Sequence, residues 1–464
     1  MMTTPSDSAE SYEQSNLTRS QLLFWAGQRL QPEAPLYNMV GLYTISSKVE
    51  PAHLERAFQT LVNSSDALRT TIEERAGAPY LKVVPWLDCA MEYVDCSRAA
   101  DAERELVVWV EGRRRILFDM TKRLFDCALL KISDEKFACY INNHQIIGDA
   151  WAGYLIHQRL SELYALSLEG RLEEKAALPP FRAYVEYERE VRRSARYRKA
   201  EAYWKDKLRE PLEPVSLYGS EPPTQTVRGA RTPCRLDAGR VRRLRTLAQR
   251  EGVFVGTPDL SLFIIFATLL FVYLHLVSVT SRLSLGVMHH NRVTKAFAET
   301  IGMFMEVLPL RIEIEEGDTF MTLTRKVAAE ALESFKNVQY TTGNPIRHKS
   351  YQATLNYINA PLSTFNGAEV EAEWIHTGYQ NEILDLNVRQ FNPRGDWILE
   401  FDFDCDLFTA DEQLGAVEHF LRILDALLDD INCPVNRPGM LLSETQRQRL
   451  RALENEACLD FARG

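Results

Sequence analysis

The residues best suited to do chemistry lie in one short stretch, whose sequence is Tyr140-Ile-Asn-Asn-His-Gln-Ile-Ile-Gly-Asp-Ala-Trp151. It places His144, Gln145 and Asp149 between an apolar run and a helix pattern, so that they follow the end of a buried strand. A strand end holds reactive groups rigidly. An imidazole exchanges protons near neutral pH, whereas an amide donates and accepts hydrogen bonds without titrating. Taken alone, the spacing favours a structural histidine over a catalytic one.

The elements around this turn alternate between helix and strand patterns, which predicts a mixed α/β (α+β) protein with two lobes. The predicted helices span residues 17–30, 51–64, 152–166, 182–208, 238–251, 260–279 and 410–428. The predicted strands span residues 39–46, 137–141, 283–288, 352–358, 384–391 and 397–403, and residues 211–232 read as a loop. We divide the chain into a polar tail (1–15), a first lobe (16–178), a second lobe (179–440, of which 179–235 joins the lobes) and a linker-like tail (441–464).

Composition excludes several classes of protein. The 464 residues include 64 acidic and 54 basic ones, a net charge of −10, which argues against a nucleic-acid partner. Residues 1–16 show no secretory signal pattern, so we expect a cytoplasmic protein. The cysteines are dispersed without metal-ligand spacing, so we predict free thiols and no metal site.

One apolar run, residues 260–279, is long enough to cross a bilayer. It contains His275, Tyr273 and Thr268, and no cluster of basic residues flanks it. We therefore predict a helix buried in the core of a soluble protein, with a membrane span as the alternative, and we expect no membrane partner.

Several motifs occur together in a characteristic order. The polar turn, His144-Gln145-Ile-Ile-Gly-Asp149-Ala150-Trp151, is in register with the signature His-His-x-x-x-Asp-Gly, which a Trp usually follows. Further matching segments are residues 17–25, 67–70, 181–184, 203–204, 301–311, 355–357, 404–408 and 442–446. On these motifs the chain resembles the condensation domains of nonribosomal peptide synthetases, which belong with the chloramphenicol acetyltransferase-like acyltransferases.

This resemblance implies two acyltransferase-like lobes in a V-shaped pseudo-dimer with a central tunnel. It implies an acyl donor and an amine or hydroxyl acceptor, each carried on the phosphopantetheine arm of a carrier protein and joined as an amide or ester. No intrinsic cofactor is expected. The implied partners are the donor and acceptor carrier proteins and neighbouring synthetase domains.

By this register, Gln145 occupies the position of the motif's second His, which the resemblance implies is the family's candidate general base or positioning group. An amide can orient an amine or polarise a carbonyl, but it cannot take up a proton at neutral pH. Three interpretations follow: catalysis by positioning, another base among His144, His289 and His290, or a degenerate module that binds carrier proteins or recruits a tailoring enzyme. A free-standing acyl-CoA transferase is a further alternative.

The resemblance assigns roles to further positions. Asp149 should pair structurally with Arg69 or Arg292, and Asn356 should contact the acceptor. Because neighbouring strand residues point to opposite faces, at most one of His289 and His290 should reach the tunnel. Besides Gln145, further positions depart from the family, whose motifs have Gly at Ala150, Arg-His at Ser64-Ser65 and Asn-Thr at Glu306-Val307.

Overall fold

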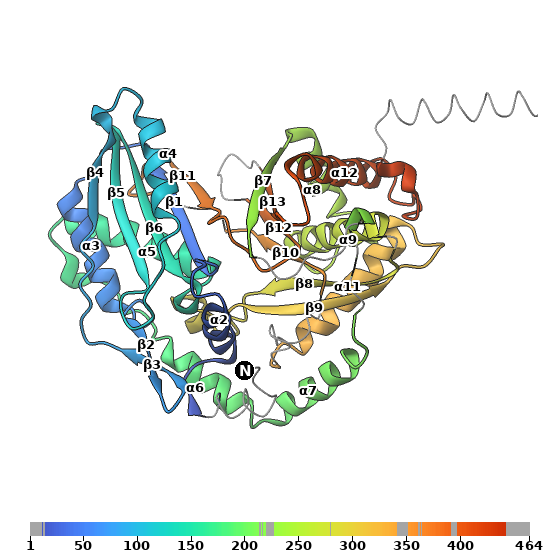
Figure 1. Cartoon of the computed structure of the whole chain (residues 1–464), viewed down its shortest axis with the longest axis horizontal. Coiled ribbons are helices and arrows are strands. Elements are labelled where there is room, and N and C mark those ends of the chain that lie inside the picture. The colour runs from blue at the N-terminus through green and yellow to red at the C-terminus, as the bar shows by residue number, and fades with distance from the viewer. Residues whose placement is uncertain are drawn as a thin grey trace, which may run out of the picture.

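The computed structural model describes residues 12–441 except 13, 213–214, 216, 220–226, 279, 341–350, 361, 363 and 391–396. Two lobes stand side by side, and helices α6 (Arg182–Val191) and α7 (Ala195–Lys207) run beneath both (Figure 1). The predicted linker-like tail beyond residue 441, including residues 442–446, lies outside the described residues.

A five-stranded sheet forms the first lobe, in the order β11-β1-β6-β5-β4. Its strands are β1 (Asn38–Ile45), β4 (Glu92–Asp95), β5 (Phe125–Ser133), β6 (Lys136–His144) and β11 (Val370–Ile375). Strands β2 (Thr70–Arg75) and β3 (Ala78–Val83) form a separate hairpin. The helices of this lobe are α2 (Arg19–Leu30), α3 (Pro51–Ser64), α4 (Ala102–Arg113) and α5 (Ala150–Leu168).

Alternating side chains give this sheet two apolar faces. On one face Tyr43 and Ile45 pack with α3 and α5, and on the other Leu42 packs with α4. The predicted helix 51–64 is confirmed to the residue, because Pro51 starts it and apolar residues follow at helical spacing.

The second lobe contains a six-stranded sheet in the order β7-β13-β12-β10-β8-β9. Its strands are β7 (Gly229–Leu236), β8 (Arg282–His289), β9 (Glu306–Glu313), β10 (Ala353–Ile358), β12 (Leu384–Arg389) and β13 (Trp397–Asp404). Its helices are α8 (Ala238–Leu247), α9 (Pro258–Ser278), α10 (Lys295–Ala298), α11 (Phe320–Lys336) and α12 (Ala410–Asp429). The predicted loop 211–232 is wrong at its end, because β7 begins at Gly229 and pairs with β13.

Helix α9 is the one described helix that is long and apolar enough to cross a membrane. Its side chains are buried almost throughout, in a core that includes apolar residues of α8, α11, α12 and the sheet. The predicted buried core helix is therefore confirmed.

The segment that joins the lobes differs from the single helix predicted over residues 182–208. It forms α6 (Arg182–Val191) and α7 (Ala195–Lys207), because Ser194 adopts an extended backbone and its hydroxyl caps α7 by accepting from the Tyr197 N–H. The side chain of Tyr12, although it lies in the predicted polar tail, is buried and donates its O–H to Glu188 of α6 at 2.9 Å.

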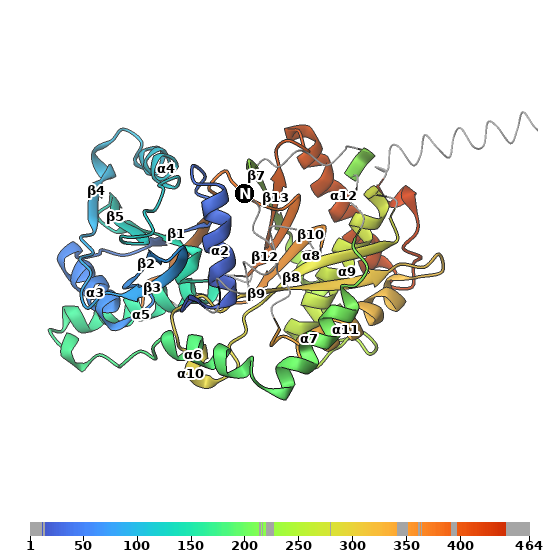
Figure 2. The same ribbon diagram turned by 60° about the horizontal axis from the view of Figure 1, so that its bottom comes forward.

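The chain also crosses back between the lobes. Strand β11, which follows β10 of the second lobe in the sequence, pairs antiparallel with β1, from Val40↔Ile375 to Ile45↔Val370. Turning the molecule shows α2 standing between the two lobes as well (Figure 2). Helix α2 also contacts the polar turn that follows β6, since Gln21 Nε2 donates to the Ile146 carbonyl at 2.8 Å.

Candidate functional site

The polar turn forms as predicted, between a buried strand and a helix. Strand β6 ends at His144, a single 3-10 turn covers Gln145–Ile147, and α5 begins at Ala150. Asp149 caps α5, since its carboxylate accepts from the Ala152 N–H at 2.8 Å. The turn is therefore fixed at both ends by regular structure.

A buried ion pair joins this turn to the second lobe. Arg292 donates from both terminal nitrogens to Asp149, at 2.7 and 3.0 Å, and both side chains are almost fully buried. The Phe304 N–H also donates to Asp149 Oδ2, at 3.0 Å. Of the two arginines suggested by the sequence, Arg69 instead donates to the Val84 carbonyl at 2.7 Å. Because a buried charge requires its partner, the Asp149–Arg292 pair is a structural link.

Gln145 is held through its backbone only. Its N–H donates to the Tyr37 carbonyl at 2.8 Å, whereas its half-buried side chain makes no hydrogen bond to any described residue. The amide thus keeps its donor and acceptor available for a bound molecule.

His144 is engaged on both ring nitrogens. Its Nδ1 accepts from the Ile146 N–H at 3.1 Å, which places the proton on Nε2, 3.4 Å from Gln28 Oε1. Complete burial lowers the pKa of His144 to about 3. With its lone pair engaged and its basicity depressed, this imidazole is poorly suited to act as a general base.

His289 and His290 lie together, with ring centroids 5.3 Å apart and ring planes inclined by 15°. The prediction that they point to opposite faces is wrong, because β8 ends at His289 and the strand alternation stops there. Each Nδ1 accepts a backbone N–H two residues ahead, from Asn291 and Arg292. Burial lowers the pKa of His289 to about 4. These contacts fix the loop that carries Arg292.

Three further motif positions lie where the lobes meet. Trp151 donates from Nε1 to the Ala298 carbonyl of the second lobe at 2.9 Å. Ala150 is the half-buried first residue of α5. Glu306, the first residue of β9, is buried and accepts from the Ser20 hydroxyl of α2 at 2.7 Å.

Asn356 belongs to a polar row across the second sheet. It donates to Asn387 Oδ1 at 3.1 Å, and Asn387 donates to Asp402 Oδ2 at 3.1 Å. Asp402 in turn accepts from Arg231 at 2.6 and 2.7 Å. This row was not predicted from the sequence, although polar residues alternate with apolar ones along both β12 and β13.

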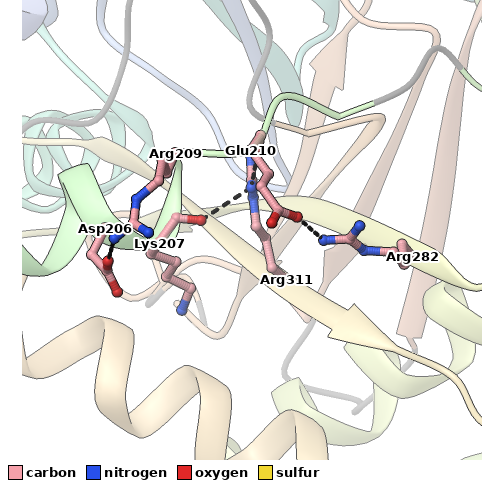
Figure 3. A pocket seen from close by; sticks show the side chains of 6 residues that line it. All are labelled: Asp206, Lys207, Arg209, Glu210, Arg282 and Arg311. Carbon is pink, nitrogen blue, oxygen red and sulfur yellow. Dashed lines mark hydrogen bonds and ion pairs between the residues drawn. The ribbon is translucent and has the colours of Figure 1, made fainter.

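A charged pocket of about 340 Å³ lies elsewhere on the second lobe (Figure 3). It is lined by Asp206, Lys207, Arg209, Glu210, Arg282 and Arg311. Arg282 begins β8 and His289 ends it, so the two lie roughly 23 Å apart at about 3.3 Å per residue. The charges that line the pocket largely neutralise one another, because Arg209 forms an ion pair with Asp206 and Arg282 forms one with Glu210. We therefore take the interlobe turn, and not this pocket, as the candidate site.

In the described part of the chain, no three His, Cys, Asp or Glu side chains are grouped to hold a metal ion. The functional groups at the interlobe turn are thus an amide, a buried ion pair and histidines bound to backbone. Such a set can orient polar reactants through hydrogen bonds.

Comparisons with known proteins agree with this geometry. The family model described as Condensation domain matches residues 12–450. One of the linear gramicidin synthase proteins of Brevibacillus parabrevis is 24% identical over 463 residues, covering 96% of this chain and 6% of that protein. One of the plipastatin synthase proteins of Bacillus subtilis (strain 168) is 22% identical over 432 residues, covering 89% of this chain and 16% of that protein.

Solved structures show the same fold. A starter condensation domain of rhizomide synthetase in complex with C8-CoA matches with a TM-score of 0.81 at 22% identity, covering 90% of this chain and 96% of that one. The first condensation domain of the calcium-dependent antibiotic synthetase, in complex with a substrate analogue, matches with a TM-score of 0.80 at 22% identity, covering 91% and 97%. The two-lobed architecture is therefore shared with these domains.

Proposed function

Because the chain belongs to the condensation-domain family, we propose that it joins an acyl donor to an amine or hydroxyl acceptor on a nonribosomal peptide or hybrid polyketide assembly line. Condensation domains of these synthetases act on substrates bound to carrier proteins, and we assign a donor and an acceptor carrier protein as its partners. The chain spans 6% and 16% of the length of two curated relatives, so neighbouring synthetase domains are further proposed partners. We place the protein in the cytoplasm with them.

One observation carries this proposal: the motif turn of the first lobe is locked against the second lobe by the Asp149–Arg292 pair. The pair holds the turn that carries Gln145 against the second lobe. The Gln145 amide makes no hydrogen bond to a described residue. Holding two tethered reactants at attack distance supplies a large share of such catalysis, equivalent to an effective concentration of about 10⁵ M or more.

The reaction itself does not consume a base. The acceptor nitrogen or oxygen attacks the donor thioester carbonyl, a C–N or C–O bond forms and the C–S bond breaks. The proton lost by the acceptor ends on the departing thiolate. In this scheme Gln145 Oε1 accepts from the attacking group or Nε2 donates to the carbonyl oxygen, so the amide orients the reactants without titrating.

A second function is favoured by one specific observation. His144 and His289 are weakly basic because burial lowers the pKa of both, to about 3 and about 4. General acid–base help is typically worth about 10²–10⁴-fold, and its absence fits a module that binds carrier proteins or recruits a tailoring enzyme without catalysis.

Acyl transfer followed by intact-protein mass spectrometry separates these functions. Acyl-loaded carrier proteins are mixed with a panel of amine and hydroxyl acceptors and with the chain, Gln145→His or Gln145→Ala. We expect transfer by the chain above the rate without it, and faster transfer by Gln145→His, by up to about 10²-fold. Gln145→Ala is the matched control, because it removes the amide without adding an imidazole.

The outcomes divide cleanly between the two functions. Transfer by the chain and loss of transfer in Gln145→Ala support positioning by the amide. If none of the three proteins transfers the acyl group but a titration still shows carrier binding, the proposed acyl transfer is wrong and the non-catalytic recruitment module is supported.

A further inference from the structure

The turn that carries Gln145 is held by one continuous segment of the first lobe, residues 20–37, which we term the α2 segment. Three consecutive residues of the turn bond to it. His144 Nε2 contacts Gln28 Oε1 at 3.4 Å, the Gln145 N–H donates to the Tyr37 carbonyl at 2.8 Å, and the Ile146 carbonyl accepts from Gln21 Nε2 at 2.8 Å. The position of the turn therefore follows the position of the α2 segment.

The same segment is tied to the second lobe at both of its ends. At its beginning, the Ser20 hydroxyl donates to the buried carboxylate of Glu306 at 2.7 Å. At its end, the Tyr37 hydroxyl accepts from Asn381 Nδ2 at 3.2 Å. Burial raises the pKa of Tyr37 to about 12, so this hydroxyl stays protonated. A displacement of the second lobe thus pulls on the α2 segment at two points.

We propose that Ser20, Glu306 and Tyr37 are positioning residues that couple the placement of the second lobe to the turn carrying Gln145. The coupling runs from Glu306 through Ser20 and the neighbouring Gln21 to the Ile146 carbonyl, and from Asn381 through Tyr37 to the Gln145 N–H. At this position, where the resembled motif has an amide, Glu306 supplies a carboxylate oxygen as the acceptor for the Ser20 hydroxyl.

This coupling extends the proposed function. Its effect on catalysis depends on that function, whereas the structural coupling does not. Reacting groups must sit within a fraction of an ångström of the attack geometry, and a displacement of about 1 Å can cost about 10²-fold in rate. The Asp149–Arg292 pair fixes the far end of the turn, and the α2 segment fixes its near end. The Gln145 amide would then be set in place only when both lobes are correctly docked.

Amide hydrogen exchange tests the coupling without any substrate. Its readout is the exchange rate of the Gln145, Ile146 and Gly148 amides in the chain, Ser20→Ala, Tyr37→Phe and the double variant. A hydrogen bond contributes about 1 kcal/mol, so we expect about fivefold faster exchange in each single variant and at least about tenfold in the double variant.

Two controls separate coupling from general loss of stability. Ser261→Ala removes an equally buried serine hydroxyl whose bonds stay local, to Thr257 and Val255, and should leave exchange of the turn unchanged. Glu306→Gln keeps an oxygen that can accept from Ser20 and should retain slow exchange, whereas Glu306→Leu should speed it as Ser20→Ala does. Unchanged exchange of the turn in the double variant would overturn the proposal.

Kinetics form a second arm once a substrate pair is known. Ser20→Ala should lower kcat by about tenfold while KM changes little, because a positioning defect acts after binding. An unchanged kcat together with faster exchange would disconnect the coupling from catalysis and leave the proposed acyl transfer intact.

Discussion

The two ends of the interlobe turn are held in opposite ways. At one end, Asp149 is bound through its side chain by Arg292, the Phe304 N–H and the Ala152 N–H. At the other end, Gln145 is bound through its backbone, and its side-chain amide makes no hydrogen bond to a described residue. The difference predicts that the motif combines two separable properties: a carboxylate that stabilises the fold, and a position whose side chain can change with little effect on stability.

Removing the Asp149 carboxylate is the strongest test of this contrast. Asp149→Ala leaves Arg292 buried without its anion, and we expect a loss of about 3–5 kcal/mol of unfolding free energy. Urea unfolding followed by circular dichroism measures it. The double variant Asp149→Ala, Arg292→Met is the control and should recover part of that loss, since it removes the unpaired charge. If Asp149→Ala unfolds at the same urea concentration as the wild-type chain, the carboxylate does not stabilise the fold and the two ends of the turn do not differ as argued.

His144 should behave like Asp149 and unlike its neighbour Gln145. His144→Ala leaves the buried Ile146 N–H without an acceptor, so we expect a loss of about 1–3 kcal/mol. His144→Asn, whose side-chain oxygen can accept the same N–H as an N-cap, should keep most of the stability. Equal unfolding midpoints for the two variants would show that the Nδ1 contact contributes nothing.

Lowering the pH should weaken the anchored side of the turn. The pKa of His144 is about 3 in the folded chain, below the ordinary value near 6.5, so the unfolded chain binds the proton first as pH falls. Stability from this group is complete above about pH 6.5 and is lost toward about pH 3, by at most about 1.4 kcal/mol per pH unit.

Urea midpoints between pH 7.5 and 5.5 check this titration. The wild-type chain should lose more stability over that interval than His144→Asn, which has no imidazole at this position. Parallel pH profiles for the two proteins would mean that the pKa of His144 is the same in the folded and the unfolded chain.

The smallest expected effect is at Gln145. Because its amide makes no bond to described residues, Gln145→Ala and Gln145→His should change the unfolding free energy by less than about 0.5 kcal/mol. Differential scanning calorimetry on both variants measures this. A loss comparable to that of Asp149→Ala would show that Gln145 is a structural residue. The two ends of the turn would then not differ in their contribution to stability.

Local sequence patterns predicted most of the described helices but fewer than half of the described strands. The apolar run after Lys136 and the helix pattern after Ala150 correctly placed the turn, and the uniform apolar run of α9 correctly indicated a buried helix. The crossing strand β11 was missed, because its partner β1 is distant in sequence and no local pattern specifies long-range pairing.

The candidate site was predictable where a motif implies a partner. The family resemblance implied that Asp149 pairs with Arg69 or Arg292, and the structure selects Arg292. The sequence could not reveal that the Nδ1 of His144 accepts from Ile146, since that contact depends on the curvature of the turn. Nor could it show that Ser20 and Glu306 meet, because their contact arises from docking of the two lobes.

The pairing of β11 with β1 has a consequence for dividing this protein. A fragment cut between the lobes would lack β11, and β1 would become an open sheet edge with unpaired N–H and C=O groups. Open edges of this kind recruit other chains and promote aggregation. A hybrid protein that exchanges one lobe alone would therefore expose the unpaired edge of β1. Exchanging the span that contains both β1 and β11 keeps that edge paired.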